Sequence, residues 1–360
     1  MEIKDIANID SNFKTTIVDN REVIYHDALQ TPFEFEGLAW GNSQYYRLPK
    51  HFTKDDINEG ALELAHQTAG CCVRFKSDSP FVAIRAKLAH CSDMNHMPRC
   101  GSCGFDLYVK NKNDKFIFLK EVQPNRDEID LERMVCDGLV SGMNEYIINY
   151  PLYGGVEKVE IGLAPGSIIQ KPTPHKIAKP ILFYGSSITQ GACASRPGNA
   201  YTSMICRKFD APQINLGFSG SGKGEKSIAE AIADLDLSCF VMDYDHNATS
   251  PEHLEETHER FYKIIREKNP ALPILMMSKC DFYPDRDRNI ERREVIKKTY
   301  ANAINAGDKF VAFIDGEELW GTEEEDRDAC SCDNCHPNDL GFYRMAEKIY
   351  PVLKDLMERK

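Results

Sequence analysis

The sequence predicts two domains of different class, an all-β sandwich followed by a doubly wound parallel α/β sheet. Three observations lead to this prediction. Apolar and polar residues alternate with period two in the first half, a proline-rich stretch follows, and strand-like and helical patterns alternate in the second half. Alternating strands and helices form parallel sheets with helices on both faces. We therefore expect residues 1–163 to form the sandwich, 164–180 a linker and 181–360 the α/β domain.

The first half contains several short runs with the length and alternation of strands. The last two of these runs flank Gly154-Gly155, which predicts a β-hairpin. Many short strands with turn residues between them, and no long helical pattern, are typical of a β-sandwich. The runs lie at 73–76, 81–88, 105–110, 116–119, 146–150 and 156–161.

The stretch 164–180 contains four prolines and little periodicity. Proline fixes φ and donates no hydrogen bond to a ladder, so this stretch is expected to be extended. After it, strands are predicted at 181–184, 213–216, 239–242, 272–277 and 310–314, and helices at 199–209, 224–235, 251–268, 288–306 and 338–357. Ser250-Pro251 is a particularly clear helix start, because a capping hydroxyl precedes a proline at the first helical position.

The composition excludes several classes of partner. The 360 residues carry a formal net charge of -12, whereas nucleic acids and anionic membranes attract clustered Lys and Arg. No apolar run approaches the ~20 residues that a membrane-spanning helix requires. The first residues lack the apolar core of a secretory signal. We therefore expect no nucleic-acid or membrane partner and a cytoplasmic location, unless a leader has been removed; a homo-oligomer is possible.

The chain contains 13 cysteines, an odd and high number. Two pairs have Cys-x-x-Cys spacing, Cys100/Cys103 and Cys332/Cys335, and Cys91, Cys330, His90 and His96 lie near them. A structural zinc site needs four converging ligands, and neither pair has a second pair close by in the sequence. We therefore interpret the cysteines as reduced thiols rather than as metal ligands.

Polar groups follow the predicted strands of the second half. Ser187 follows the first strand, and a glycine-rich turn at 215–222 follows the second. Asn247 comes soon after the third strand, and Asp333 and His336 precede the last helix. Ligands of open α/β sheets bind at the carboxyl ends of the strands. A serine, backbone N–H donors, an amide and an Asp/His pair are the parts of an acyl-transfer site.

The order of these groups resembles that of the GDSL, or SGNH, hydrolases. Gly185-Ser186-Ser187-Ile188-Thr189 resembles their Gly-Asp-Ser-(Leu/Ile) block, and 215–220 resembles the second block. Asn247 ends a third block, and Asp333-x-x-His336-Pro337 resembles the last. The resemblance covers 179–360 and implies an SGNH-hydrolase-like, flavodoxin-like sheet. In the first half, Gly104-Phe105-Asp106-Leu107-Tyr108 resembles the Gly-x-Asp-Leu-Tyr motif of a jelly-roll-like sandwich module found ahead of such domains.

The resemblance implies a role for each matching residue. Ser187 is the expected nucleophile, His336 the general base, and Asp333 the carboxylate that orients the imidazole. The expected oxyanion hole consists of the backbone N–H groups of Ser187 and Gly220 and the side-chain amide of Asn247. Ser186 remains an alternative nucleophile, because it stands where the family has Asp, and Gly217 an alternative to Gly220. No metal and no organic cofactor is expected.

The resemblance further implies a serine esterase that hydrolyses short acyl esters, above all the O-acetyl groups of carbohydrates, through an acyl-enzyme. The expected partner is thus a small-molecule or oligosaccharide ester. The alternatives are a lipase- or thioesterase-type hydrolase and a catalytically silent carbohydrate-binding protein. Stacking aromatics could come from the first half, with Trp40, Tyr45 and Tyr46 as candidates. For His96 a structural role is preferred to a contact with the active site, and for Asp106 a turn or strand-edge position is preferred to a contact with a substrate. Asp245 and His246 receive no role.

Overall fold

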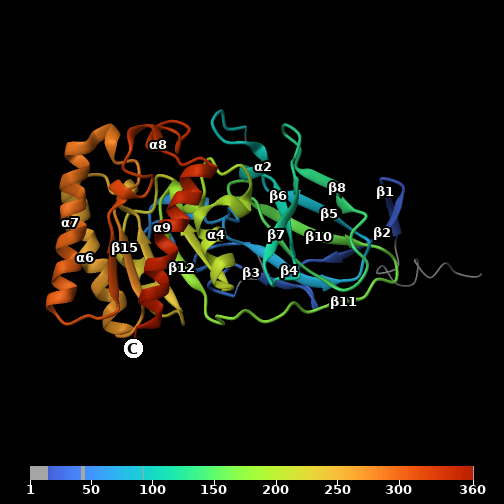
Figure 1. Cartoon of the computed structure of the whole chain (residues 1–360), viewed down its shortest axis with the longest axis horizontal. Helices are drawn as coiled ribbons and strands as arrows, with labels where there is room; N and C mark the ends of the chain where they lie inside the picture. Colours follow the sequence, from blue (N-terminus) through green and yellow to red (C-terminus); the bar gives the residue numbers. More distant parts are fainter. Residues whose placement is uncertain (1–14, 42–44, 92, 360) are drawn as a thin grey trace, which may run out of the picture.

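The computed structural model describes residues 15–41, 45–91 and 93–359. In Figure 1 the α/β region lies on the left and the β region on the right, side by side along the long axis. The β region contains two antiparallel sheets, and the α/β region contains a parallel sheet, so the predicted fold class is confirmed. Within the described residues, no helix combines the length and the apolar character that a membrane crossing requires.

The β region is a sandwich of two antiparallel sheets around a shared apolar core. One sheet has the order β1-β2-β10-β5-β8, and the other has the order β11-β4-β9-β6-β7 with β3 paired to β4. Two short helices, α1 (Glu59–Leu64) and α2 (Arg99–Ser102), interrupt the strands. The strands are β1 (Thr15–Val18), β2 (Arg21–Asp27), β3 (Glu34–Glu36), β4 (Cys72–Ser77), β5 (Phe81–Leu88), β6 (Phe105–Lys110), β7 (Phe116–Val122), β8 (Asp130–Asp137), β9 (Asn144–Asn149), β10 (Val156–Leu163) and β11 (Ile169–Gln170).

The hairpin predicted around Gly154-Gly155 is wrong, although both of its strands exist. β9 pairs with β4 and β6, whereas β10 pairs with β2 and β5, so the two strands belong to different sheets. The two glycines serve close packing instead of a tight turn. A Cβ on Gly155 would lie 2.6 Å from the His66 carbonyl oxygen, and one on Gly154 would lie 3.1 Å from the Cys103 Cα.

The α/β region contains a five-stranded parallel sheet in the order β13-β12-β14-β15-β16. The order reverses at β12, so the carboxyl edge of this strand is where such folds place a ligand. The strands are β12 (Ile181–Gly185), β13 (Gln213–Gly217), β14 (Cys239–Asp243), β15 (Ile274–Met277) and β16 (Val311–Ile314), and the helices are α3 (Ser187–Gln190), α4 (Tyr201–Phe209), α5 (Lys226–Ala233), α6 (Pro251–Lys268), α7 (Arg286–Asn305), α8 (Glu324–Asp328) and α9 (Asp339–Glu358).

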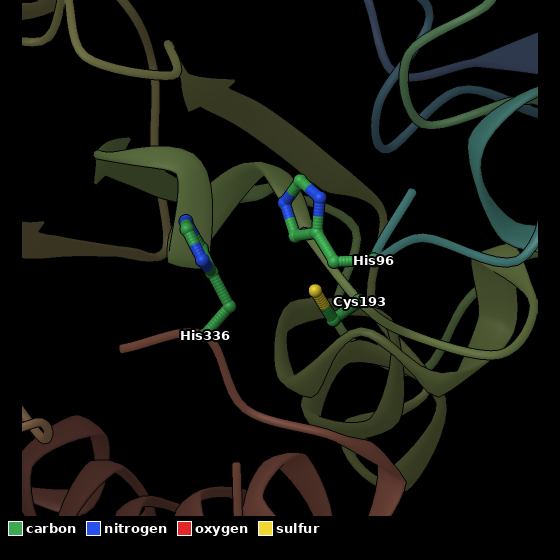
Figure 2. A group of neighbouring side chains, drawn as sticks. All are labelled: His96, Cys193 and His336. Carbon is green, nitrogen blue, oxygen red and sulfur yellow. The ribbon is translucent and has the colours of Figure 1, made fainter. Parts of the chain in front are cut away.

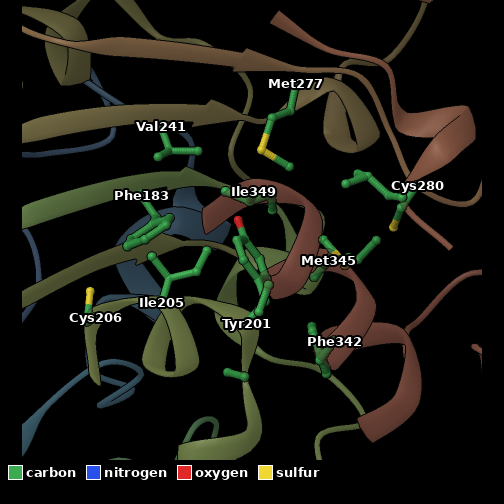
Figure 3. Close-up of a cluster of buried hydrophobic side chains, with 14 of the residues drawn as sticks. Phe183, Tyr201, Ile205, Cys206, Val241, Met277, Cys280, Phe342, Met345 and Ile349 are labelled. Atoms are coloured by element: carbon green, nitrogen blue, oxygen red, sulfur yellow. The ribbon is translucent and has the colours of Figure 1, made fainter. Parts of the chain in front are cut away.

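Alternate residues of the central strand β12 enter two different cores. Phe183 packs with residues of α4 and α9 on one face of the sheet, as Figure 3 shows. Tyr184 packs with residues of α5, α6 and α7 on the other face. Because helices cover both faces, every residue of β12 is buried, which explains why the sequence shows an uninterrupted apolar run there.

The Gly-x-Asp-Leu-Tyr motif forms a joint between the two regions. In β6, Phe105 and Leu107 point into the sandwich core, so Asp106 and Tyr108 point to the opposite face, toward the α/β region. The Asp106 carboxylate accepts a hydrogen bond from the Gly198 N–H at 2.7 Å, and the Arg207 guanidinium lies 4.3 Å from the Tyr108 ring centroid. Asp106 is fully buried, so its expected turn or strand-edge position is corrected to a buried position within the joint.

Residues 45–67 also reach the α/β region. Ala61 of α1 belongs to the core of the sheet face covered by α5 and α6. The buried Arg47 guanidinium donates to the carbonyl oxygens of Asn215 and Gly217 at 2.9 and 2.8 Å, at the end of β13. Residues 169–170, within the stretch expected as a linker, form β11 and pair with β4. The two regions are thus joined by packing as well as by the chain.

Candidate active site

Ser187 lies at the first position of the short helix that follows β12. Gly185 makes the sharp exit from the strand possible, because a Cβ there would lie 2.4 Å from the Asp243 carbonyl oxygen. Ser186 is the N-cap: its Oγ accepts the Ile188 N–H at 3.1 Å, and Thr189 completes a capping box. The two adjacent serines therefore have different tasks, and the Ser187 hydroxyl is the one that is turned away from the cap.

The loop before α9 brings a histidine and a carboxylate to Ser187. His336 Nε2 lies 3.0 Å from Ser187 Oγ, and His336 Nδ1 lies 2.8 Å from Asp333 Oδ2. The backbone N–H of His336 also donates to Asp333 Oδ1 at 2.7 Å, and Asn334 has a φ of 61° in the turn between them. This local turn holds the carboxylate on the Nδ1 side of the ring. The three predicted residues Ser187, His336 and Asp333 thus form one hydrogen-bonded chain.

Electrostatics around His336 favour its charged form. Burial opposes a positive charge on the ring, but hydrogen bonds with Cys335 and Asp333 outweigh burial and raise the pKa of His336 above its ordinary value. Burial likewise opposes the Asp333 carboxylate, yet bonds from the His336 backbone and ring lower the pKa of Asp333. The pair therefore stabilises an imidazolium, which is the state that a histidine reaches when it accepts a proton from a serine.

The glycine-rich turn after β13 discriminates between the two glycines considered for the oxyanion hole. The Gly217 N–H already donates to Asn215 Oδ1 at 2.8 Å, and a Cβ at Gly217 would lie 2.2 Å from the Gln190 nitrogen. Gly220 is exposed, has a φ of +66°, and a Cβ there would meet nothing within 4 Å. Gly217 is therefore closely packed with its N–H already bonded, whereas Gly220 borders open space. This difference favours Gly220 over Gly217 as the oxyanion donor.

Asn247 ends the short helix Asp245–Asn247 after β14. Its Nδ2 donates to the Phe218 carbonyl oxygen at 2.7 Å, on the same glycine-rich turn. A side-chain amide carries two N–H groups, so this bond orients the amide and leaves the second N–H for another acceptor. The backbone N–H of Ser187 is at a helix start, where N–H groups have no partner within the helix.

A second polar cluster adjoins the site and was not assigned from the sequence. His246 Nδ1 lies 3.0 Å from Asp281 Oδ1, and His246 Nε2 lies 3.3 Å from Cys335 Sγ. Burial opposes ionisation of Cys335, but hydrogen bonds with His246 and His336 lower the pKa of its thiol to about 7. The neighbouring Asp245 is structural, because Arg292 Nε donates to its Oδ1 at 2.8 Å. In the sequence, the position of His246 directly before Asn247 is the only feature that could have indicated this cluster.

His96 lies beside the site, as in the alternative considered for it. Its ring is exposed, and its centroid is 5.5 Å from that of His336. Among the three aromatics considered for stacking, Tyr45 is largely buried against Phe35 and Tyr150, and it lines a surface cavity together with Tyr46. An aromatic-lined cavity of about 300 Å³ lies elsewhere, against the loop that carries His336; it is lined by Phe282, Tyr283, Pro284, Trp320, Glu324, Arg327, Asp328, Ser331 and Asn334.

Two family models together match most of the chain. Residues 178–354 match the GDSL-like lipase/acylhydrolase family. Residues 23–169 match the GxDLY family, which is described as the N-terminus of Esterase_SGNH_hydro-type. No curated protein sequence matches the chain.

Solved structures share the whole arrangement. A Bacteroides ovatus ATCC 8483 protein described as a GDSL-like lipase is 29% identical, with 94% of this chain and 99% of that chain covered and a TM-score of 0.84. A salicylyl-acyltransferase from a tetracycline biosynthetic pathway is 21% identical, with 93% and 97% covered and a TM-score of 0.74. A family two carbohydrate esterase from Cellvibrio japonicus is 12% identical, with 93% and 98% covered and a TM-score of 0.61. The last two likenesses concern the fold alone.

Proposed function

Because residues 178–354 of this chain belong to the GDSL-like lipase/acylhydrolase family, we propose that it is a serine esterase that removes short acyl groups from carbohydrate esters. One observation carries this proposal. His336 Nε2 lies 3.0 Å from Ser187 Oγ, and on the other side of the same ring His336 Nδ1 lies 2.8 Å from Asp333 Oδ2. This order is that of a nucleophile, a general base and an orienting carboxylate.

The reaction follows from the positions of these atoms. Ser187 Oγ attacks the ester carbonyl carbon while its proton passes to His336 Nε2, and Asp333 stabilises the resulting imidazolium. His336 then returns the proton to the leaving alkoxide, and the acyl group stays on Ser187. Water, activated by the same ring, releases the acid and restores the serine. Besides the ester and water, the scheme uses only groups of the chain.

Negative charge develops on the ester carbonyl oxygen during the attack. Hydrogen-bond donors are needed to stabilise this charge, on the side of the ester opposite to His336. We assign these donors to the backbone N–H groups of Ser187 and Gly220 and to the Asn247 amide. The 2.7 Å bond from Asn247 Nδ2 to the Phe218 carbonyl supports this assignment, since it couples the amide to the turn that carries Gly220. Donors fixed in advance are effective because they need no reorganisation during the reaction.

Two features support a sugar ester with a short acyl group. The loops after the strands, at 219–224, 243–250 and 330–338, are small and polar, so they offer little apolar surface to a long acyl chain. A neutral sugar also meets no repulsion from a chain with net charge -12.

The test is a series of aryl esters from acetate to octanoate, followed by acetylated oligosaccharides with product masses read by mass spectrometry. We expect kcat/KM to be highest for acetate, acetyl loss from one or more oligosaccharides, and no turnover by Ser187→Ala. A steady rise of kcat/KM with chain length would instead establish a lipase-like or thioesterase-like enzyme. Binding of oligosaccharides without hydrolysis of any ester would establish a catalytically silent binding protein.

A further inference from the structure

Three possible metal ligands from three separate segments converge next to Ser187. His96 comes from the β region, Cys193 from the loop after α3, and His336 from the loop before α9 (Figure 2). One ligand atom of each residue lies within 4.8 Å of the other two. Ester hydrolysis as proposed above needs neither His96 nor Cys193, so their position at the base His336 calls for another explanation.

Both imidazoles are oriented in the way that histidine ligands usually are. His96 Nδ1 lies 3.0 Å from Asn95 Oδ1, and His336 Nδ1 lies 2.8 Å from Asp333 Oδ2. With an N–H donated to oxygen on the Nδ1 side, the lone pair of a neutral ring is on Nε2. An oxygen acceptor on the second ring nitrogen is the common outer support of a metal-bound histidine. Here both rings have that support.

Cys193 supplies a thiol between the two rings. Its side chain is buried, and its Sγ points toward the space between His96 and His336 in Figure 2. Its backbone φ of +68° lies in the left-handed region, which is uncommon for a residue with a Cβ. Such conformations persist where the surrounding structure enforces them, and they gather at functional sites.

The donor set selects the metal. Two imidazole nitrogens and one thiolate suit zinc, whereas magnesium and calcium prefer oxygen ligands. Tetrahedral zinc with bonds of about 2.0–2.3 Å places its ligand atoms roughly 3.5 Å apart. Ligand atoms that already lie within 4.8 Å of one another can converge on one ion through small side-chain movements. In the neighbouring group of His246, Asp281 and Cys335, the carboxylate and the thiol contact opposite nitrogens of the His246 ring, at 3.0 and 3.3 Å, so they do not converge on one shared ring nitrogen.

We propose that His96, Cys193 and His336 form a zinc-binding site, and that bound zinc inhibits the enzyme. Zinc on His336 Nε2 occupies the lone pair that faces Ser187 Oγ at 3.0 Å, so the ring cannot accept the serine proton. Binding releases the Cys193 thiol proton to solvent, and the thiolate forms the zinc–sulfur bond. The inhibition rests on the proposed esterase function, but the binding of zinc does not.

The site is tested by titrating Zn²⁺ into the metal-free full chain in a calorimeter. Co²⁺ serves as a spectroscopic probe, because a thiolate ligand gives it a charge-transfer band. Variants Cys193→Ser and His96→Ala are compared with Cys136→Ser and His51→Ala, a half-buried thiol and an exposed histidine far from the site in sequence. Ester hydrolysis by each variant is followed against Zn²⁺ and expressed relative to its own rate without metal.

We expect one Zn²⁺ per chain, a cobalt–thiolate band, and inhibition that a chelator reverses. Cys193→Ser and His96→Ala should each weaken binding and inhibition by about tenfold or more, while Cys136→Ser and His51→Ala behave as the unaltered chain. His96→Ala removes an exposed side chain and is expected to fold. If Cys193→Ser fails to fold, His96→Ala therefore still tests the site. Absence of binding, or binding by both ligand variants that is as tight as that of the unaltered chain, overturns the site. Zinc binding by a chain that hydrolyses no ester keeps the site and overturns the proposed function.

Discussion

Asp106 and Asp333 are both carried by short sequence motifs, yet they lie in opposite surroundings. Asp106 is fully buried between the two regions of the molecule, and its two oxygens accept hydrogen bonds from Asn149 Nδ2 and the Gly198 N–H, each at 2.7 Å. Asp333 is exposed in a loop and contacts the imidazole of His336. An aspartate whose oxygens accept hydrogen bonds from buried N–H groups stabilises the fold, whereas one bonded to a histidine beside a serine is placed to assist catalysis.

The comparison predicts that changes around Asp333 alter activity and that changes around Asp106 alter stability. The largest effect is expected for Ser187→Ala, which should lower kcat by ~10⁶-fold, because the nucleophile is lost. Its thermal midpoint should stay that of the unaltered chain. The matched control is Ser186→Ala, which removes the helix cap and should cost about 1 kcal/mol of stability while activity remains. The opposite pattern would make Ser186 the nucleophile.

Asp333→Asn is the next largest change. The amide can donate to His336 Nδ1, which moves the ring proton to Nε2 and prevents it from accepting the Ser187 proton. We expect kcat to fall by ~10⁴-fold, with little change in the urea midpoint because Asp333 is exposed. A loss of activity below about tenfold would mean that another group, such as Cys335, orients the ring.

Asn247→Ala tests the oxyanion assignment. Loss of one donor should lower kcat by about 10²–10³-fold, with KM nearly unchanged, because the donor acts on charge that appears in the transition state. Stopped-flow and steady-state assays with an aryl acetate separate the two constants. A rise in KM at constant kcat would assign Asn247 to substrate binding instead.

The α/β region could be predicted almost element by element. Helix α6 begins and ends at the predicted residues 251 and 268, because Ser250-Pro251 marks its start locally. The end of the first strand also placed Ser187 at the carboxyl edge of the sheet, whereas the resemblance to the GDSL hydrolases joined Asp333 and His336 to it, in the contacts now seen. These features follow from periodicity, caps and parallel topology, all of which are local in the sequence.

Long-range relations could not be predicted. Gly154-Gly155 looked like a turn, but its glycines are required by the approach of His66 and Cys103, residues distant in sequence. The approach of His96 to His336 depends on how the two regions dock, and no periodicity encodes that. The role of Asp106 has the same origin, since its partner Gly198 lies 92 residues away.

Asp106→Ala is expected to have the smallest effect on catalysis and to reveal the joint. The change leaves the Gly198 N–H and the Asn149 amide without their acceptor, and each buried group left unsatisfied costs about 1–3 kcal/mol. We expect the free energy of unfolding in urea to fall by about 2–4 kcal/mol, while kcat changes by less than about tenfold. Asp106→Asn should destabilise as well, because one of its two positions must then be an NH₂ group facing an N–H donor.

The control for this last prediction is Asp130→Ala, an exposed carboxylate of the same sandwich, which should change neither quantity measurably. Asp106 holds the loop at Gly198, and the same loop leads into α4, whose Tyr201 hydroxyl donates to Asp243 at 2.6 Å behind Ser187. Some of the lost stability can therefore reach the site as a rise in KM, even where the variant is fully folded. If Asp106→Ala abolished turnover at unchanged stability, the carboxylate would act in catalysis, and the distinction between the two aspartates would fail.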